Sequence, residues 1–209
     1  MRKLLLFIFY FFLLNSPTFA LIEVDITRGN LNPLPIAVSP FYVEPGSKDI
    51  KENDKVIKNI GEEIAKIIEV NFKRSGLFNP LKKDSFVQNP DIAHVKPRFE
   101  DWRLIKAQAL VTGKVSVLEN RLRTEFRLWD VVAAKEMVAV AFSTTPDNWR
   151  RVAHMISDKI YQRLTGEDGY FDTRIIYVSE TGLKTQRYKK LAIMDQDGAN
   201  VKYLTLGNE

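Results

Sequence analysis

Apolar side chains recur at three- and four-residue steps in two stretches of the chain, which is the spacing of an amphipathic helix. The first stretch covers residues 56–72 and stops at Gly76, with Asn53 or Asp54 as the candidate N-cap. The second covers residues 149–164 and also stops at a glycine. We therefore expect two main helices, each ended by a glycine.

The residues around these helices carry strand patterns. Residues 36–41 read as a buried strand, and residues 108–144 alternate apolar and polar side chains in three segments, which indicates an antiparallel meander with one solvated face. Residues 99–106 allow one or two helical turns. The sequence therefore predicts an α+β domain over residues 34–166, a small mixed sheet with the two main helices packed on one face.

Short strand patterns continue from residue 167 to residue 209. An Asp-Gln-Asp-Gly turn at 195–198 separates two of them, as in a propeller blade or another antiparallel sheet. A blade needs four strands in roughly 40–45 residues, and several blades must stack to bury their faces. We therefore expect residues 167–209 to be an incomplete first blade, with a frayed and partly disordered tail.

The first twenty residues have the pattern of a secretory signal peptide. Arg2 and Lys3 precede an unbroken apolar run at 4–14, and cleavage is expected between Ala20 and Leu21. An uncleaved anchor is the alternative, although the apolar run is short for a membrane span. No other segment approaches that length, so we expect a periplasmic protein that is not embedded in a membrane after cleavage.

Export changes how the charge is interpreted. Removing Arg2 and Lys3 lowers the basic count from 31 to 29 against 26 acidic residues, a net charge near +3. An exported, mildly basic chain is not expected to bind nucleic acid. The absence of cysteine means that the fold depends on its core without disulfides, which fits a bacterial periplasm.

The segment 21–33 has the alternation of a strand with one apolar face, followed by strand-breaking residues. It is either an ordinary edge strand or a strand that can be added to the sheet of another protein. The candidate partner-binding residues are Leu21, Ile22, Glu23, Val24, Asp25, Ile26, Thr27, Arg28, Gly29, Asn30, Leu31 and Asn32.

Residues suited to catalysis are few. The chain has no cysteine and only two histidines, His94 in a proline-rich loop and His154 at the edge of the second helix, where a surface or structural role is favoured over catalysis. Asp195 and Asp197 resemble part of a calcium loop, but the closing Glu is missing, so a hairpin turn accounts for them better. Nucleophile-elbow, phosphate-loop and zinc-protease motifs are absent. We expect no enzyme activity, no cofactor and no metal site.

Several motifs resemble the TolB family of the periplasmic Tol-Pal envelope system, and the likeness spans nearly all of residues 21–209. They are PIAVSPF at 35–41, SGLFNP at 75–80, DWR at 101–103, ALVTG at 109–113, and AHMISDKIY, LTG, GYF and TRI between 153 and 175.

The resemblance implies an amino-terminal α/β domain followed by a six-bladed propeller. It also implies a non-enzymatic adaptor that binds the inner-membrane partner TolA through residues 21–32. The propeller, which we expect to be absent from this chain, would bind the lipoprotein Pal and colicins that exploit the system. The implied role is outer-membrane constriction in cell division and envelope integrity. Because the chain departs from the family by stopping inside the first blade, we expect it to be a fragment.

Two alternatives stay open. The chain is the non-catalytic portion of a secreted peptidase whose propeller gates a serine hydrolase domain, or it is a stand-alone envelope-binding domain. A nucleophile elbow downstream of the blades would favour the first, and a natural stop codon after Glu209 would favour the second.

Overall fold

The mixed sheet predicted for the first domain is present in the computed structural model, which describes residues 22, 32–52 and 55–207. Two parallel pairings join β1 to β5 and to β6, whereas β6, β7 and β8 form the predicted antiparallel meander. The spatial order is β5 (Phe78–Pro80), β1 (Leu34–Val38), β6 (Ala109–Leu118), β7 (Arg121–Asp130) and β8 (Lys135–Thr144), with β2 (Tyr42–Val43) pairing separately with β6.

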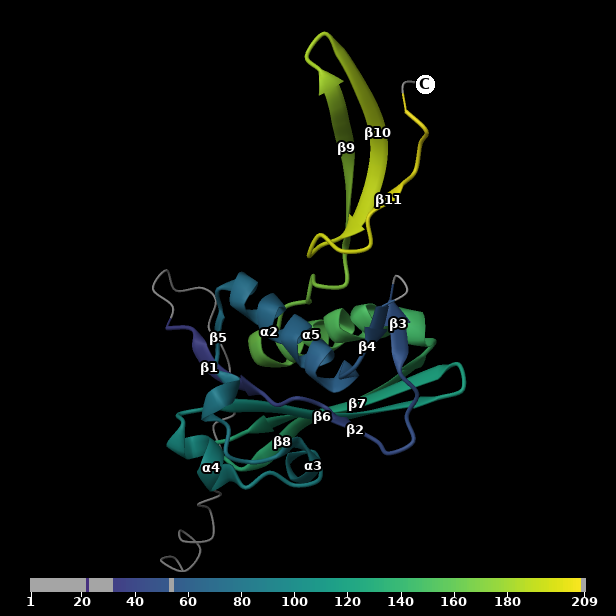
Figure 1. Ribbon diagram of the computed structural model, residues 1–209. Coiled ribbons are helices and arrows are strands. Elements are labelled where there is room, and N and C mark those ends of the chain that lie inside the picture. The colour runs from purple at the N-terminus through teal and green to yellow at the C-terminus, as the bar shows by residue number, and fades with distance from the viewer. Residues whose placement is uncertain (1–21, 23–31, 53–54, 208–209) are drawn as a thin grey trace, which may run out of the picture.

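The two main helices, α2 (Ile60–Ser75) and α5 (Trp149–Thr165), lie side by side on one face of this sheet, as predicted (Figure 1). Their apolar stripes meet the inward side chains of the strands in a single core. Gly76 ends α2 in the left-handed conformation, which glycine adopts without strain. None of the helices in the described ranges is both long and apolar enough to cross a membrane.

The start of α2 differs from the prediction. The helix begins at Ile60 with Asn59 as N-cap, and the Asn59 side chain accepts a hydrogen bond from the N–H of Glu62. Residues 55–57 belong instead to β4 (Lys55–Ile57), which pairs with β3 (Ile50–Glu52). Cross-strand pairing therefore overrides the helical spacing of the apolar residues there.

The opposite face of the sheet carries a thinner layer that the sequence indicated only in part. It holds the helical turns predicted near residue 100 and a second, smaller core around Trp102, whose indole N–H donates to Gln88 Oε1 at 3.0 Å. β6 is buried along most of its length because helices cover both of its faces. The elements of this layer are η1 (Lys83–Ser85), α3 (Pro90–Ala93) and α4 (Phe99–Leu104).

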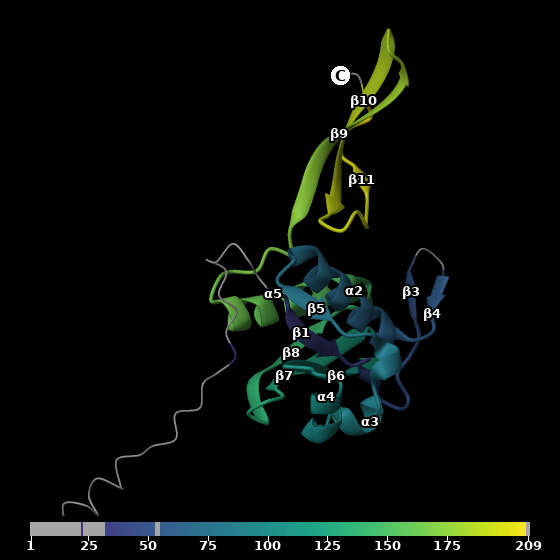
Figure 2. The same ribbon diagram turned by 90° about the vertical axis from the view of Figure 1, so that its left-hand side faces the viewer.

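After η2 (Pro146–Asn148) and α5, the chain forms a separate antiparallel sheet that projects from the domain on the side of α2 and α5 (Figure 2). Its strands are β9 (Arg174–Leu183), β10 (Gln186–Asp195) and β11 (Lys202–Tyr203). These residues have a defined sheet where we expected a frayed tail. Many of its apolar side chains are exposed, including Ile176, Val178 and Leu183, whereas Ala192 is buried. The sheet has the form of a partial blade.

Candidate functional site

Most of the predicted partner-binding segment lies outside the described residues. That is true of Ala20 and Leu21 at the predicted cleavage point, and of residues 23–31. Ile22 is half-buried and packs against the main core, and Asn32 is exposed. The role of residues 21–32 therefore stays a prediction.

The chain that leaves α5 is anchored to the main core. Both carboxylate oxygens of Asp158 accept backbone N–H groups, from Phe171 at 2.7 Å and from Asp172 at 3.0 Å. Burial raises the pKa of Asp158, although these two N–H groups favour its charged form. Phe171 is fully buried, and its ring lies 5.8 Å from that of Tyr161 and 6.4 Å from that of Phe72. The projecting sheet therefore starts from a fixed base.

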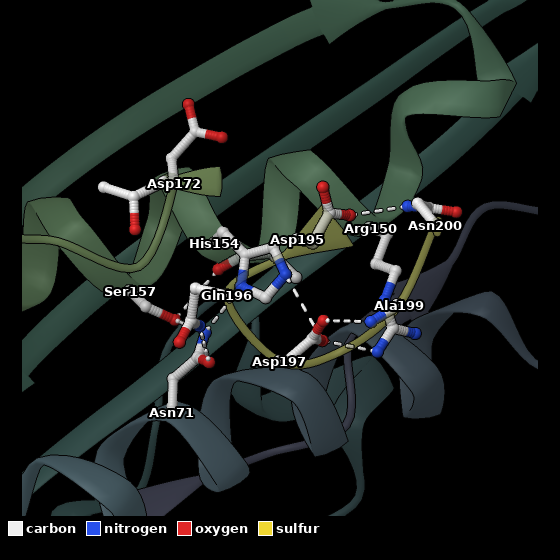
Figure 3. A network of polar contacts seen from close by, with 12 residues as sticks. Asn71, Arg150, His154, Ser157, Asp172, Asp195, Gln196, Asp197, Ala199 and Asn200 are labelled. Atoms are coloured by element: carbon white, nitrogen blue, oxygen red, sulfur yellow. Dashed lines mark hydrogen bonds and ion pairs between the residues drawn. The ribbon is translucent and has the colours of Figure 1, made fainter. Parts of the chain in front are cut away.

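A second attachment comes from the turn that follows β10. Gln196 reaches α2, where its Nε2 donates to Asn71 Oδ1 at 3.0 Å (Figure 3). Its carbonyl accepts from Arg74 at 3.3 Å. Asp197 reaches α5, where its Oδ2 accepts from Arg150 at 2.5 Å. We call this set the junction; its members are Asn71, Arg150, His154, Ser157, Gln196 and Asp197.

Hydrogen bonds within the junction decide which nitrogen of His154 carries the proton. The Ser157 hydroxyl donates its only hydrogen to the carbonyl of Ala153 at 2.9 Å, so Ser157 Oγ accepts from Asn71 Nδ2, also at 2.9 Å. Asn71 Nδ2 uses its other hydrogen toward His154 Nδ1 at 3.0 Å. Nδ1 is therefore an acceptor, and neutral His154 carries its proton on Nε2. Nε2 lies 3.4 Å from Asp197 Oδ2 and finds no hydrogen-bond partner among the described residues.

Burial and neighbouring charges have opposing effects on the pKa values of His154 and Asp197. Burial lowers the pKa of His154, and the attraction of Asp197 only partly offsets this effect. Burial would raise the pKa of Asp197, but the N–H of Ala199 and the guanidinium of Arg150 outweigh it and leave that pKa below its usual value. At neutral pH the junction therefore holds a neutral imidazole beside a charged Arg150–Asp197 pair.

The junction also brings three potential metal ligands together. One atom each of His154, Asp195 and Asp197 lies within 4.8 Å of the others. Asp197 is already paired with Arg150, and Asp195 Oδ2 accepts from Asn200 at 2.6 Å. A metal ion would have to replace the Nε2 proton and compete with Arg150, so the arrangement suits docking better than metal coordination. The Gly198 N–H donates to the carbonyl of Asp195 at 2.9 Å, which closes the predicted hairpin turn.

His94, the other histidine, lies on the far face of the sheet. Its ring stacks on Tyr42 with the centroids 4.5 Å apart, and its Nδ1 is 3.0 Å from the carbonyl oxygen of Pro90. A cavity of about 370 Å³ lies beside it, lined by His94 and Val95, which follow α3, and by residues of β6, β7 and β8. The charged side chains around this cavity form ion pairs, for example Arg127 with Glu136 at 3.2 Å. Its lining residues offer no pair of a nucleophile and a base.

The sequence placed His154 at the edge of a helix, whereas the structure buries it to 98 % between α2, α5 and the turn. The available signal was Asn71, an amide between Val70 and Phe72 in an otherwise apolar helical stripe. A buried amide requires polar partners. Its partners lie 83 to 125 residues away in the chain, and no local pattern identifies them.

Comparison with known proteins places the chain in a family. Residues 22–137 match the family described as the TolB amino-terminal domain. The chain belongs to the TolB family. A protein named Tol-Pal system protein TolB, from Pelagibacter ubique (strain HTCC1062), is 66% identical over 202 residues, which are 95% of this chain and 45% of that protein. The chain thus spans a little under half the length of this curated relative.

Among solved structures, TolB from Acinetobacter baumannii matches the fold with a TM-score of 0.66 and 24% identity, over 88% of this chain and 41% of that one. The mixed sheet with its helices and the partial blade is thus a TolB-like fold. The two alternatives, a part of a peptidase and a stand-alone domain, gain no support from these matches.

Proposed function

We propose that this chain is the amino-terminal part of a non-enzymatic adaptor of the Tol-Pal system, exported to the periplasm by residues 1–20. Residues 21–32 would bind TolA by strand addition, and the propeller begun by β9–β11 would bind Pal. Such an adaptor would link the two membranes, support constriction of the outer membrane in division, and be exploited by colicins. The observation that carries the proposal is the 66% identity, over 95% of the chain, to a protein named as a Tol-Pal component.

The chemistry of residues 21–32 supports the binding mode. Strand addition takes its affinity from backbone hydrogen bonds and its selectivity from every second side chain. Ile22, Val24 and Ile26 supply such an alternating apolar face, and the Gly29-Asn30 step separates it from β1. Ile22 packs on the core only as a half-buried side chain, so a partner that covers it more fully would compete for it.

Deletion of residues 21–32 tests the proposal. We expect binding to the periplasmic domain of TolA, measured by calorimetry, to fall below detection, and the Tm of the remaining chain to change by only a few degrees. The small effect on Tm is expected because, among the described residues of this segment, Ile22 packs on the core only as a half-buried side chain and Asn32 is exposed.

Two triple variants give a matched control. Changing Ile22, Val24 and Ile26 together to Ser should weaken TolA binding by about tenfold or more. The reason is that burial of each apolar side chain contributes about 1.5–3 kcal/mol of binding free energy. Changing Glu23, Asp25 and Thr27 to Ser should have a much smaller effect. TolA binding that persists after the deletion would contradict the proposed binding mode.

A further inference from the structure

The junction contains a buried titratable group that the proposed function does not use. His154 is 2% exposed and sits where the turn after β10 meets the domain. The groups around it come from each packed element: Arg150 and Asp158 on α5, Asn71 and Arg74 on α2, Asp172 in the segment after α5, and Asp195 and Asp197 in the turn. A charge on His154 would interact electrostatically with Arg150, Asp158, Asp172, Asp195 and Asp197.

A second proton on His154 must go to Nδ1, because Nε2 already carries one. Nδ1 faces Asn71 Nδ2 at 3.0 Å, which is itself a donor. Two N–H groups would then point at each other in a buried space, and one side must turn away.

The Asn71 amide cannot solve this conflict by turning over alone. In its present orientation, Nδ2 donates to Ser157 and Oδ1 accepts from Gln196 Nε2. A turned amide would accept from His154, but it would present its N–H groups to Gln196 Nε2 and would no longer donate to Ser157 Oγ. Protonation at Nδ1 therefore requires either that the Asn71 and Gln196 amides turn over together or that their contact, which joins α2 to the turn, is broken.

Asp197 does not offset the cost of a charged His154 in the docked arrangement. Its Oδ2 lies 3.4 Å from Nε2, on the side of the ring away from the new proton, and it is already shared with Arg150 at 2.5 Å. The guanidinium of Arg150 adds a repulsive charge when His154 becomes cationic.

We propose that His154 makes the docking of the β10–β11 turn acid-sensitive, so that protonation of its Nδ1 releases Gln196 from Asn71 and weakens the second attachment of the projecting sheet, which then depends on the contacts of Arg74 with Gln196 and of Arg150 with Asp197. The first attachment, through Asp158 and Phe171, makes no hydrogen bond to His154, so the sheet loosens but does not detach. This device goes beyond the proposed function. It concerns how two parts of the chain are joined, and its failure would leave TolA binding untouched.

The direction of the pH dependence follows from linkage. The docked state holds the pKa of His154 below its ordinary value of 6.5. Between the two pKa values the undocked state binds more protons, so docking is strongest above about pH 6.5 and weakens as the pH falls below it. The docking equilibrium should fall by up to about tenfold per pH unit in that window.

An NMR titration of the full chain between pH 7.5 and pH 4.5 tests the proposal. The ring signals of His154 report its protonation, and the backbone signals of Gln196, Asp197 and Gly198 report docking. We expect both sets to change with one midpoint, below that of an ordinary histidine. Turn signals that stay constant while His154 titrates would overturn the proposal, and this result needs no variant.

Two variants separate His154 from other acid effects. His154→Asn keeps an acceptor where Nδ1 stands and cannot titrate, so the turn signals should stay constant across the range. His94→Asn removes the other histidine, on the far face of the sheet, and should leave the titration of the turn unchanged. A turn that responds equally in His154→Asn and the wild-type chain would show that a carboxylate is the sensor, against the proposal.

Discussion

Replacing Phe171 by alanine should destabilise the domain that precedes it. Phe171 is fully buried, and its ring packs on Tyr170 at 4.6 Å, Tyr161 at 5.8 Å and Phe72 at 6.4 Å. Truncating a buried Phe to Ala costs about 3–5 kcal/mol through lost transfer free energy and the cavity that is left. Tyr170 is partly exposed and can move into the space, so we expect the lower end, about 3 kcal/mol.

Urea unfolding followed by circular dichroism measures this loss in the free energy of unfolding. Thermal unfolding gives a second measure: at about 2–4 °C per kcal/mol for a chain of this size, the Tm should fall by about 6–12 °C. Leu183→Ala is the control, because Leu183 lies at the end of β9 and is 74% exposed, and it should change stability by less than about 0.5 kcal/mol. A Phe171→Ala chain that loses less than about 1 kcal/mol would refute the reasoning, since it would mean that residues 167–173 are not held in the core in solution.

Gly61→Ala should destabilise the chain by about 3 kcal/mol or more, because the added Cβ would lie 1.9 Å from the backbone carbonyl oxygen of Phe41 and would force α2 from its place. The check is the urea midpoint beside that of Glu63→Ala, and equal midpoints would contradict the close approach. Asn59→Ala should cost about 1 kcal/mol, since it removes the N-cap acceptor of α2, whereas Asn59→Asp should keep most of the stability. Equal Tm values for the two Asn59 variants would mean that the N-cap hydrogen bond does not contribute to stability.

Local patterns were sufficient for the elements that have one solvated and one buried side. The alternation in β7 is visible both in the sequence and in its burial, with Leu122, Thr124, Phe126 and Leu128 turned inward. The stripe on α5 was also evident, because a helix that packs on a sheet keeps its apolar residues on one side. The turn at Asp195–Gly198 followed from its residue types.

Patterns failed where pairing over a distance decided the outcome. Val56 and Ile57 continue the helical spacing of α2, yet they lie in β4 because β3 pairs with them. Phe78–Pro80 carries no strand pattern of its own, and it becomes β5 because β1 offers it a parallel edge. The second helical layer on β6 was likewise underestimated, because short helices carry too few residues to show a period.

The sequence by itself determined the family, the two main helices, the meander and the absence of an evident catalytic motif. These follow from residue order and local periodicity. Only the tertiary structure decided that His154 is buried, that its proton resides on Nε2, and that Asn71 and Gln196 join the turn to α2. The physical reason is that a hydrogen-bond network depends on which atoms meet in space, and these residues lie up to 125 positions apart in the chain.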